Sequence, residues 1–272
     1  LQSRGLGDVY KRQIERHPEK WEAFKTYTHS QIGELMSNYG TIDILWLDGG
    51  WVSPRNNQDI DMPQIAAMAR AKQPGLLVVD RTIHGKYENY QTPEQKIPEH
   101  QLPYPWESCV TLTTDWGWVK NPVYKTPNRI ISILMEVVAK GGNLLLGVGP
   151  TAEGLIEQPT VKRLQEIGRW MQKNGKAIFH TRITPNYHCG NVWFTADKNG
   201  RTLYALYALP EGETLPAVIE WEGNVPERGT SVRLLSTGQR MKWIERDGKV
   251  AVALPAKLAG STEPIALQFD TP

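Results

Sequence analysis

Residues 42–51 read I-D-I-L-W-L-D-G-G-W, and this stretch decides how the rest of the chain is interpreted. Its first half is a short apolar run rich in β-favouring residues, which predicts a buried strand over residues 42–47. The run ends in Asp48, and parallel α/β folds place their chemistry at the carboxyl ends of such strands. Gly49 and Gly50 allow a sharp turn and leave room beside the acid. The residues alone leave a second interpretation open, in which Asp48 only shapes the turn.

Aromatic residues gather around this acid and around other acidic residues. The sequence has ten tryptophans, and five of them lie in loop-like stretches near candidate acids: Trp46, Trp51, Trp106, Trp116 and Trp118. Aromatic faces beside carboxylates suit a sugar ring, whose C–H faces stack on them while its hydroxyls need polar partners. Core packing is the usual role of tryptophan, so the clustering favours a sugar site without requiring one.

The composition is that of an ordinary globular protein. Its 272 residues can form two domains, and 40% of them are hydrophobic and 22% charged. The net charge of +2 gives no electrostatic argument for binding nucleic acid or a membrane surface. No apolar run approaches the ~20 residues of a transmembrane helix. Cys109 and Cys189 lack metal-ligand spacing, and reduced thiols are favoured over a bridge between them.

Helical and strand patterns alternate along the first two thirds of the chain. Residues 1–13 show no clear period, and we expect them to be a non-native lead before a missing N-terminus. Beyond them the patterns predict helices over residues 18–38, 62–72, 128–140 and 158–174, and strands over 42–47, 75–80, 106–112 and 143–148. Alternation of this kind predicts parallel strands with right-handed crossovers.

After about residue 180 the pattern changes to short alternating runs. Asn199-Gly200 and Asp247-Gly248 separate such runs and are strong hairpin signals. We therefore expect residues 181–272 to form an antiparallel β-sandwich.

Five segments together resemble the retaining α-L-fucosidases of glycoside hydrolase family 29. W-L-D-G-G-W at 46–51 is similar to the family's nucleophile motif. The other four follow in the family's order: V-D-R at 79–81, P-W-E-S-C at 105–109, W-G-W at 116–118 and G-G-N-L-L-L-G-V-G-P at 141–150. The sequence departs from the family at Gly147, where many members have Asn, and at Val79, where Asn is usual.

The resemblance implies a fold. Residues 14–180 are expected to be the C-terminal half of a (β/α)8 barrel, because only one predicted helix precedes the motif and four predicted strands make half a barrel. The N-terminal strands are expected to be missing, and the family's β-sandwich follows at residues 181–272.

The resemblance also implies a pair of catalytic acids. Retaining cleavage uses two carboxyl groups about 5–5.5 Å apart, one attacking the anomeric carbon and one protonating the leaving oxygen. Asp48 matches the family nucleophile. Glu107 is our first choice for the acid/base, because an apolar site beside Trp106 would favour its protonated form. Glu94 is the alternative acid/base, and Glu107 could instead be a strand-end acid paired with a cation.

Three further residues resemble sugar-binding residues of the family. Arg81 could hold a ring oxygen or hydroxyl and stabilise the ionised form of Asp48, or it could be a structural ion-pair partner. Trp46 and Trp116 resemble residues that pack on the sugar, with core or loop packing as the alternative. No cofactor and no metal site is expected.

The function implied is removal of terminal α-L-fucose from glycoconjugates or oligosaccharides, with a fucosylated glycan as the partner. One alternative is a truncated, non-catalytic fragment with weak carbohydrate binding, and another is a glycosidase of the same barrel type with a different sugar specificity. The resemblance suggests a secreted, periplasmic or lysosomal location.

Overall fold

The computed structural model describes residues 14–50, 52–81 and 86–272. The expectations for residues 1–13 and for Trp51 therefore lie outside the described residues. The chain divides into two compact units, Leu1–Thr92 and Pro93–Pro272, which are described separately. The domain boundary predicted at residue 180 falls inside the second unit and stays a prediction.

The first unit contains one parallel strand pair and its helices. Its elements are α2 (Pro18–Asn38), β1 (Ile44–Leu47), η1 (Pro54–Asn56), α3 (Met62–Lys72) and β2 (Leu77–Asp80). β1 and β2 are parallel, as the alternation predicts, and Leu47 lies opposite Asp80. The Asp61 side chain accepts from the Gln64 backbone N–H and caps α3.

The second unit begins with another parallel pair and two long helices. Its first elements are β3 (Glu107–Thr111), α4 (Pro127–Ala139), β4 (Asn143–Gly147), α5 (Gln158–Asn174) and η2 (Gly175–Ala177). β3 and β4 run parallel, with Glu107 opposite Asn143. One face of β3 packs on α4 through Val110 and Val137, which are both buried. The predicted helices and strands are confirmed within a few residues at each end.

The remainder of the second unit is the predicted antiparallel sandwich. Its strands are β5 (His188–Cys189), β6 (Val192–Ala196), β7 (Thr202–Tyr207), β8 (Val218–Glu222), β9 (Val232–Leu234), β10 (Arg240–Met241), β11 (Trp243–Arg246), β12 (Lys249–Ala253) and β13 (Ile265–Asp270). They form a six-stranded sheet, β10-β9-β13-β7-β6-β5, and a three-stranded sheet, β11-β12-β8. Asp247 and Gly248 both have positive φ, as a two-residue hairpin turn requires.

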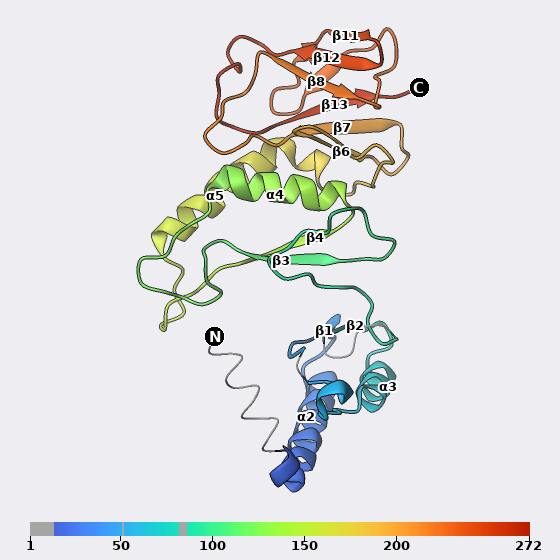
Figure 1. Ribbon diagram of the computed structural model, residues 1–272, viewed down its shortest axis with the longest axis vertical. Helices are drawn as coiled ribbons and strands as arrows, with labels where there is room; N and C mark the ends of the chain where they lie inside the picture. The colour runs from blue at the N-terminus through green and yellow to red at the C-terminus, as the bar shows by residue number, and fades with distance from the viewer. Residues whose placement is uncertain (1–13, 51, 82–85) are drawn as a thin grey trace. The chain divides into compact units, whose positions relative to one another are not determined.

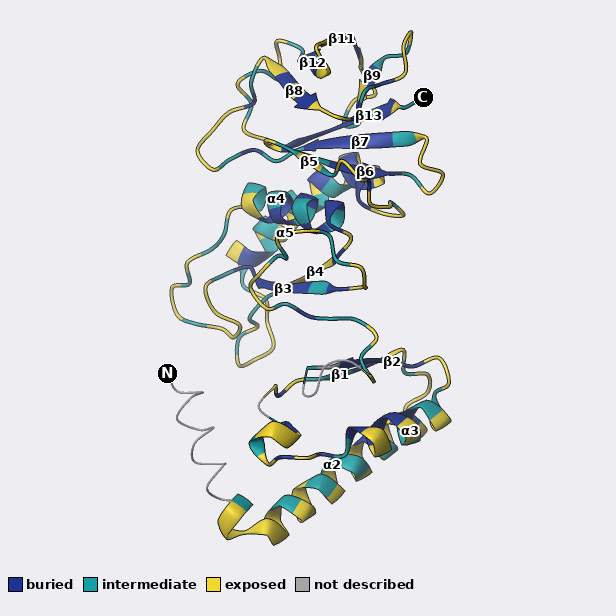
Figure 2. Cartoon of the chain, turned by 45° about the vertical axis from the view of Figure 1, so that its right-hand side comes forward, coloured by how far each residue is buried: buried dark blue, intermediate teal, exposed yellow. Residues whose placement is uncertain are grey.

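Helices α4 and α5 lie between the β3–β4 pair and the six-stranded sheet (Figure 1). Ile131 of α4, Trp170 of α5 and Leu206 of β7 share one buried cluster. The Trp170 indole N–H donates to the carbonyl of Pro264 at 2.7 Å. Figure 2 shows β6 and β7 largely buried. The helices and the sandwich therefore share a core, which explains why both fall in one unit.

The parallel strands do not form one continuous sheet among the described residues. They form two separate pairs, β1–β2 and β3–β4, and the described residues contain no closed barrel. Among the described residues, β4 pairs with β3 alone. None of the residues of β4 is buried, although its sequence is N-L-L-L-G. The expected barrel half is therefore confirmed here only as parallel α/β structure.

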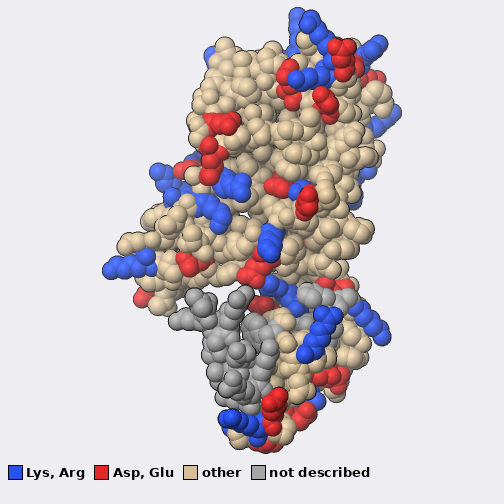
Figure 3. All heavy atoms as spheres, in the orientation of Figure 1, with Lys and Arg blue, Asp and Glu red and all other residues tan. Residues whose placement is uncertain are grey.

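Other expectations concern the surface and the cysteines. Cys109 and Cys189 are both reduced thiols, as favoured from the sequence. Over the part of the chain that the structure describes, no helix combines the length and apolar character needed to cross a bilayer. Basic and acidic side chains lie among one another on the face drawn in Figure 3.

Candidate active site

Asp48 and Arg81 lie at the same edge of the first strand pair. Each directly follows its strand, and the parallel register places the two strand ends side by side. Arg81 Nη1 donates to Asp48 Oδ1 at 3.2 Å. The Asp48 side chain is 67% exposed and that of Arg81 is 18% exposed. The guanidinium is therefore held against the protein, while the carboxylate remains accessible.

The two glycines shape the turn that carries Asp48. Gly49 has φ of +120°, a conformation that side chains rarely adopt, and its N–H donates to Asp48 Oδ1 at 2.8 Å. A Cβ on Gly50 would lie 3.2 Å from the carbonyl oxygen of Arg81. Asp48 thus shapes its turn, as the second interpretation holds, and also pairs with the arginine.

The Trp46 ring lies against the guanidinium of Arg81. The Arg81 Cζ atom lies 5.2 Å from the centroid of the Trp46 ring, which is a cation–π distance. The Trp46 Nε1 atom is buried and has no hydrogen-bond partner among the described residues. The guanidinium occupies one face of this ring, so the contact of Trp46 with sugar stays a prediction.

Glu107 lies at the amino end of β3. It is the first residue of the strand, and Cys109 Sγ is 3.9 Å from Glu107 Oε1. Parallel folds place catalytic groups at the carboxyl ends of strands, which for β3 is at Thr111. This position gives no support to Glu107 as acid/base.

Glu94 lies beside β3, further than Glu107 toward the carboxyl end of that strand. It forms a parallel bridge with Cys109, so it is two residues beyond Glu107 along the strand direction, about 6.6 Å at 3.3 Å per residue. Glu94 Oε1 accepts from the Trp116 indole N–H at 2.8 Å. The Trp116 ring in turn lies against Gly147, the last residue of β4. Two predicted residues that are 22 positions apart, Glu94 and Trp116, are therefore in direct contact.

Trp106 does not lie in a loop. It is 1% exposed and packs in the cluster beneath α4, and its indole N–H points to the Lys140 carbonyl at 3.3 Å. The expectation that it belongs to an aromatic loop near the acids is wrong, because the adjoining Gly142 leaves space for the ring in the core.

Lys125 is a residue that the sequence interpretation missed. Its Nζ donates to the carbonyl of Thr111 at 2.7 Å and to that of Thr113 at 3.0 Å. Burial, with a smaller effect of Arg129, lowers the pKa of Lys125. The side chain thus secures the loop that leaves β3 and leads to Trp116, but a lone lysine in a loop gives no sequence signal for that role.

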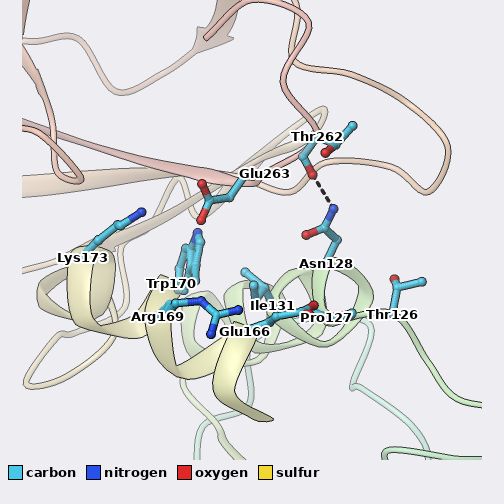
Figure 4. A pocket seen from close by; sticks show the side chains of 10 residues that line it. All are labelled: Thr126, Pro127, Asn128, Ile131, Glu166, Arg169, Trp170, Lys173, Thr262 and Glu263. Carbon is cyan, nitrogen blue, oxygen red and sulfur yellow. Dashed lines mark hydrogen bonds between the residues drawn. The ribbon is translucent and has the colours of Figure 1, made fainter. Parts of the chain in front are cut away.

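The groove in Figure 4 lies apart from these residues. It has a volume of about 350 Å³ and is bounded by the amino end of α4, by α5 and by the segment before β13. Asn128 donates to the carbonyl of Thr262 across it. None of the predicted site residues lines this groove, which lies where helices α4 and α5 meet the sandwich.

Comparison with known protein families gives one match. The family model described as "Alpha-L-fucosidase" matches residues 6–176. Human plasma alpha-L-fucosidase is 29% identical over 262 residues, which cover 88% of this chain and 53% of that protein. The chain therefore spans about half the length of the curated relatives it matches.

Solved structures agree with this match. Alpha-L-fucosidase isoenzyme 1 from Paenibacillus thiaminolyticus superposes with a TM-score of 0.79 at 28% identity, covering 92% of this chain and 63% of that one. Thermotoga maritima alpha-fucosidase in complex with fucose superposes with a TM-score of 0.72 at 25% identity, covering 91% and 56%.

Proposed function

The chain belongs to the alpha-L-fucosidase family, and we propose that it forms part of an enzyme that hydrolyses terminal α-L-fucose from glycoconjugates or oligosaccharides. The observation that carries the proposal is the exposed carboxylate of Asp48, paired with Arg81 at the carboxyl edge of two parallel strands. A fucosylated glycan is the proposed substrate.

Asp48 is the proposed nucleophile. In a retaining double displacement the carboxylate attacks the anomeric carbon, and the leaving oxygen departs with a proton from the acid/base. Arg81 and the Gly49 N–H both donate to Oδ1, so the Asp48 carboxylate is held in one orientation. Water then cleaves the glycosyl ester and returns the configuration at the anomeric carbon to that of the substrate.

Glu94 is the proposed acid/base, in preference to Glu107. Its position nearer the carboxyl end of β3 and its contact with Trp116 support this choice. Glu107 begins β3 and is the alternative. Trp116 is proposed to line the sugar site with its remaining face, since the residue is 43% exposed. Trp46 is proposed to act mainly by packing its ring against the guanidinium of Arg81.

The proposed scaffold is part of a (β/α)8 barrel followed by the sandwich. Two parallel pairs, each crossing through a helix, support this architecture. The uncovered leucines of β4 support it as well, because an apolar strand without a second neighbour lacks the burial that parallel strands normally have. The remaining strands would come from the part of the relatives that this chain does not span.

Chemical rescue by azide in the complete enzyme tests these roles. In Asp48→Gly, azide occupies the space of the missing carboxylate and attacks opposite the leaving group, so a dinitrophenyl fucoside is expected to give β-L-fucosyl azide. In Glu94→Gly, Asp48 still forms the intermediate and azide displaces it, which gives α-L-fucosyl azide.

Glu107→Gly is the matched control and is expected to retain turnover without azide. If Glu107→Gly gives the α-azide and Glu94→Gly keeps its activity, the two glutamates have exchanged roles. Full activity of Asp48→Gly without azide would contradict the whole proposal. Fucose binding by the 272-residue chain without any turnover would favour the non-catalytic alternative.

A further inference from the structure

We infer that Gly147 is a positioning residue for Glu94 and acts through Trp116. The inference deepens the proposed function, because it assigns a means of orienting the proposed acid/base. All three residues lie in the second unit, so the argument needs only that unit.

The Trp116 ring occupies the space that a side chain at position 147 would need. A Cβ on Gly147 would lie 2.7 Å from Trp116 Cζ3 and 2.9 Å from Cε3. Gly147 is not among the glycines with positive φ, so its backbone would accept alanine without strain. A glycine inside a strand also weakens the strand relative to a residue with a side chain. The physical requirement at 147 is therefore space for the indole.

A second close approach fixes the same loop. A Cβ on Gly149 would lie 2.5 Å from the Gly117 carbonyl carbon and 2.6 Å from the Trp118 backbone N. The Trp118 indole N–H donates to Glu157 Oε2 at 3.0 Å. The loop at residues 116–118 therefore packs closely against Gly147, the last residue of β4, and against Gly149, which follows the strand.

This close packing determines the direction of the Trp116 indole N–H. It donates to Glu94 Oε1 at 2.8 Å. A donor in this position orients the carboxyl group. An acid/base that donates its proton to the leaving oxygen and then takes one from water depends on that orientation. Gly147 therefore sets the geometry of Glu94 without contacting substrate.

Many members of the family resembled have Asn where Gly147 stands, and an asparagine side chain would require a different position for the Trp116 ring.

The first test measures the indole N–H signal of Trp116 by ¹H–¹⁵N NMR in the 272-residue chain, without substrate. Trp116→Phe assigns the signal, which is expected to titrate with pH in the unmodified chain and to stop titrating in Glu94→Gln. Gly147→Ala is expected to shift the signal and remove its titration, with the other indole signals unchanged. The control is Gly168→Ala in α5, where an added Cβ meets no atom within 4 Å. An unchanged, still titrating Trp116 signal in Gly147→Ala overturns the inference.

The second test measures kcat/KM in the complete enzyme. Gly147→Ala is expected to lower kcat/KM roughly tenfold for phenyl fucoside, a poor leaving group, and to leave it unchanged for dinitrophenyl fucoside, which needs no acid. In a Trp116→Ala background, Gly147→Ala is expected to cause no further loss. Equal losses for both substrates, or additive losses in that background, mean a general structural effect and overturn the inference. The NMR result stands even if the enzyme acts on another sugar, so the two proposals fail separately.

Discussion

At the scale of single residues, the site depends on how Arg81 is held. Its guanidinium faces the Trp46 ring and donates to Asp48 at the same time. A guanidinium is planar and delocalised, so it can stack on an aromatic face and at the same time direct an N–H to a neighbouring carboxylate. The two contacts together fix the carboxylate before any substrate binds.

Arg81→Lys therefore tests more than charge. A hydrogen bond to a charged group contributes about 1.5–3 kcal/mol, so we expect kcat/KM for an aryl α-L-fucoside to fall roughly 10–100-fold. Arg201→Lys on the exposed surface of the sandwich is the control and is expected to retain full activity. An Arg81→Lys enzyme as active as this control would show that the stacked guanidinium is dispensable.

The proximity of Asp48 and Arg81 was predictable from the sequence, and the positions of Glu94 and Glu107 along β3 were not. The D-G-G turn and the arginine after the next strand identify Asp48 and Arg81, because parallel strands bring their carboxyl ends together. The choice between Glu94 and Glu107 depends on which end of β3 each one reaches. Glu94 reaches β3 by a bridge from a loop, which has no sequence period to reveal it.

At the scale of elements, β7 places a tyrosine in the shared core. Tyr204 is 2% exposed, and it belongs to the cluster that contains Trp170. Burial raises the pKa of Tyr204, with Asp197 and Asp270 adding to the effect. The unfolded chain therefore loses this proton first, and stability should fall as pH rises above the usual tyrosine value of about 10.

Tyr204→Phe removes this linkage. We expect the melting temperature of the variant to fall less steeply than that of the unmodified chain between about pH 9 and 11, because the variant has no proton to lose at this position. Tyr104→Phe is the matched control, since Tyr104 is 40% exposed. Equal slopes for the unmodified chain and Tyr204→Phe would refute the assignment.

Periodicity was sufficient for the long elements and insufficient for the short ones. The helical stripes and apolar runs predict α2 to α5 and β1 to β4 to within two residues at each end. β5 and β10 have two residues each, too few for any period, and their pairing is set by neighbouring strands.

At the scale of the whole molecule, the second unit joins helices and sandwich through a common core. The change of sequence pattern near residue 180 predicts a boundary there, yet Ile131 and Trp170 before it pack on Leu206 after it. A change of periodicity reports the type of structure and carries no information about which layers pack together.

Fragments of the chain test this organisation. Residues 93–272 are expected to unfold in one cooperative transition, whereas residues 181–272 alone should be less stable, because removal of α4 and α5 exposes Leu206, Ala266 and Tyr204. Thermal denaturation followed by circular dichroism compares the two. An equal melting temperature for both fragments would show that the sandwich is stable without the helices.

The central claim, that Asp48 attacks the sugar, is tested most directly by trapping the covalent intermediate. A 2-deoxy-2-fluoro-α-L-fucosyl fluoride has a good leaving group and a slowed second step, because fluorine at C2 destabilises the oxocarbenium-like transition state. Peptide mass spectrometry of the treated complete enzyme should find one fluorofucosyl adduct, on Asp48, that disappears from Asp48→Gly. An active enzyme that carries the adduct on any other residue would contradict the account.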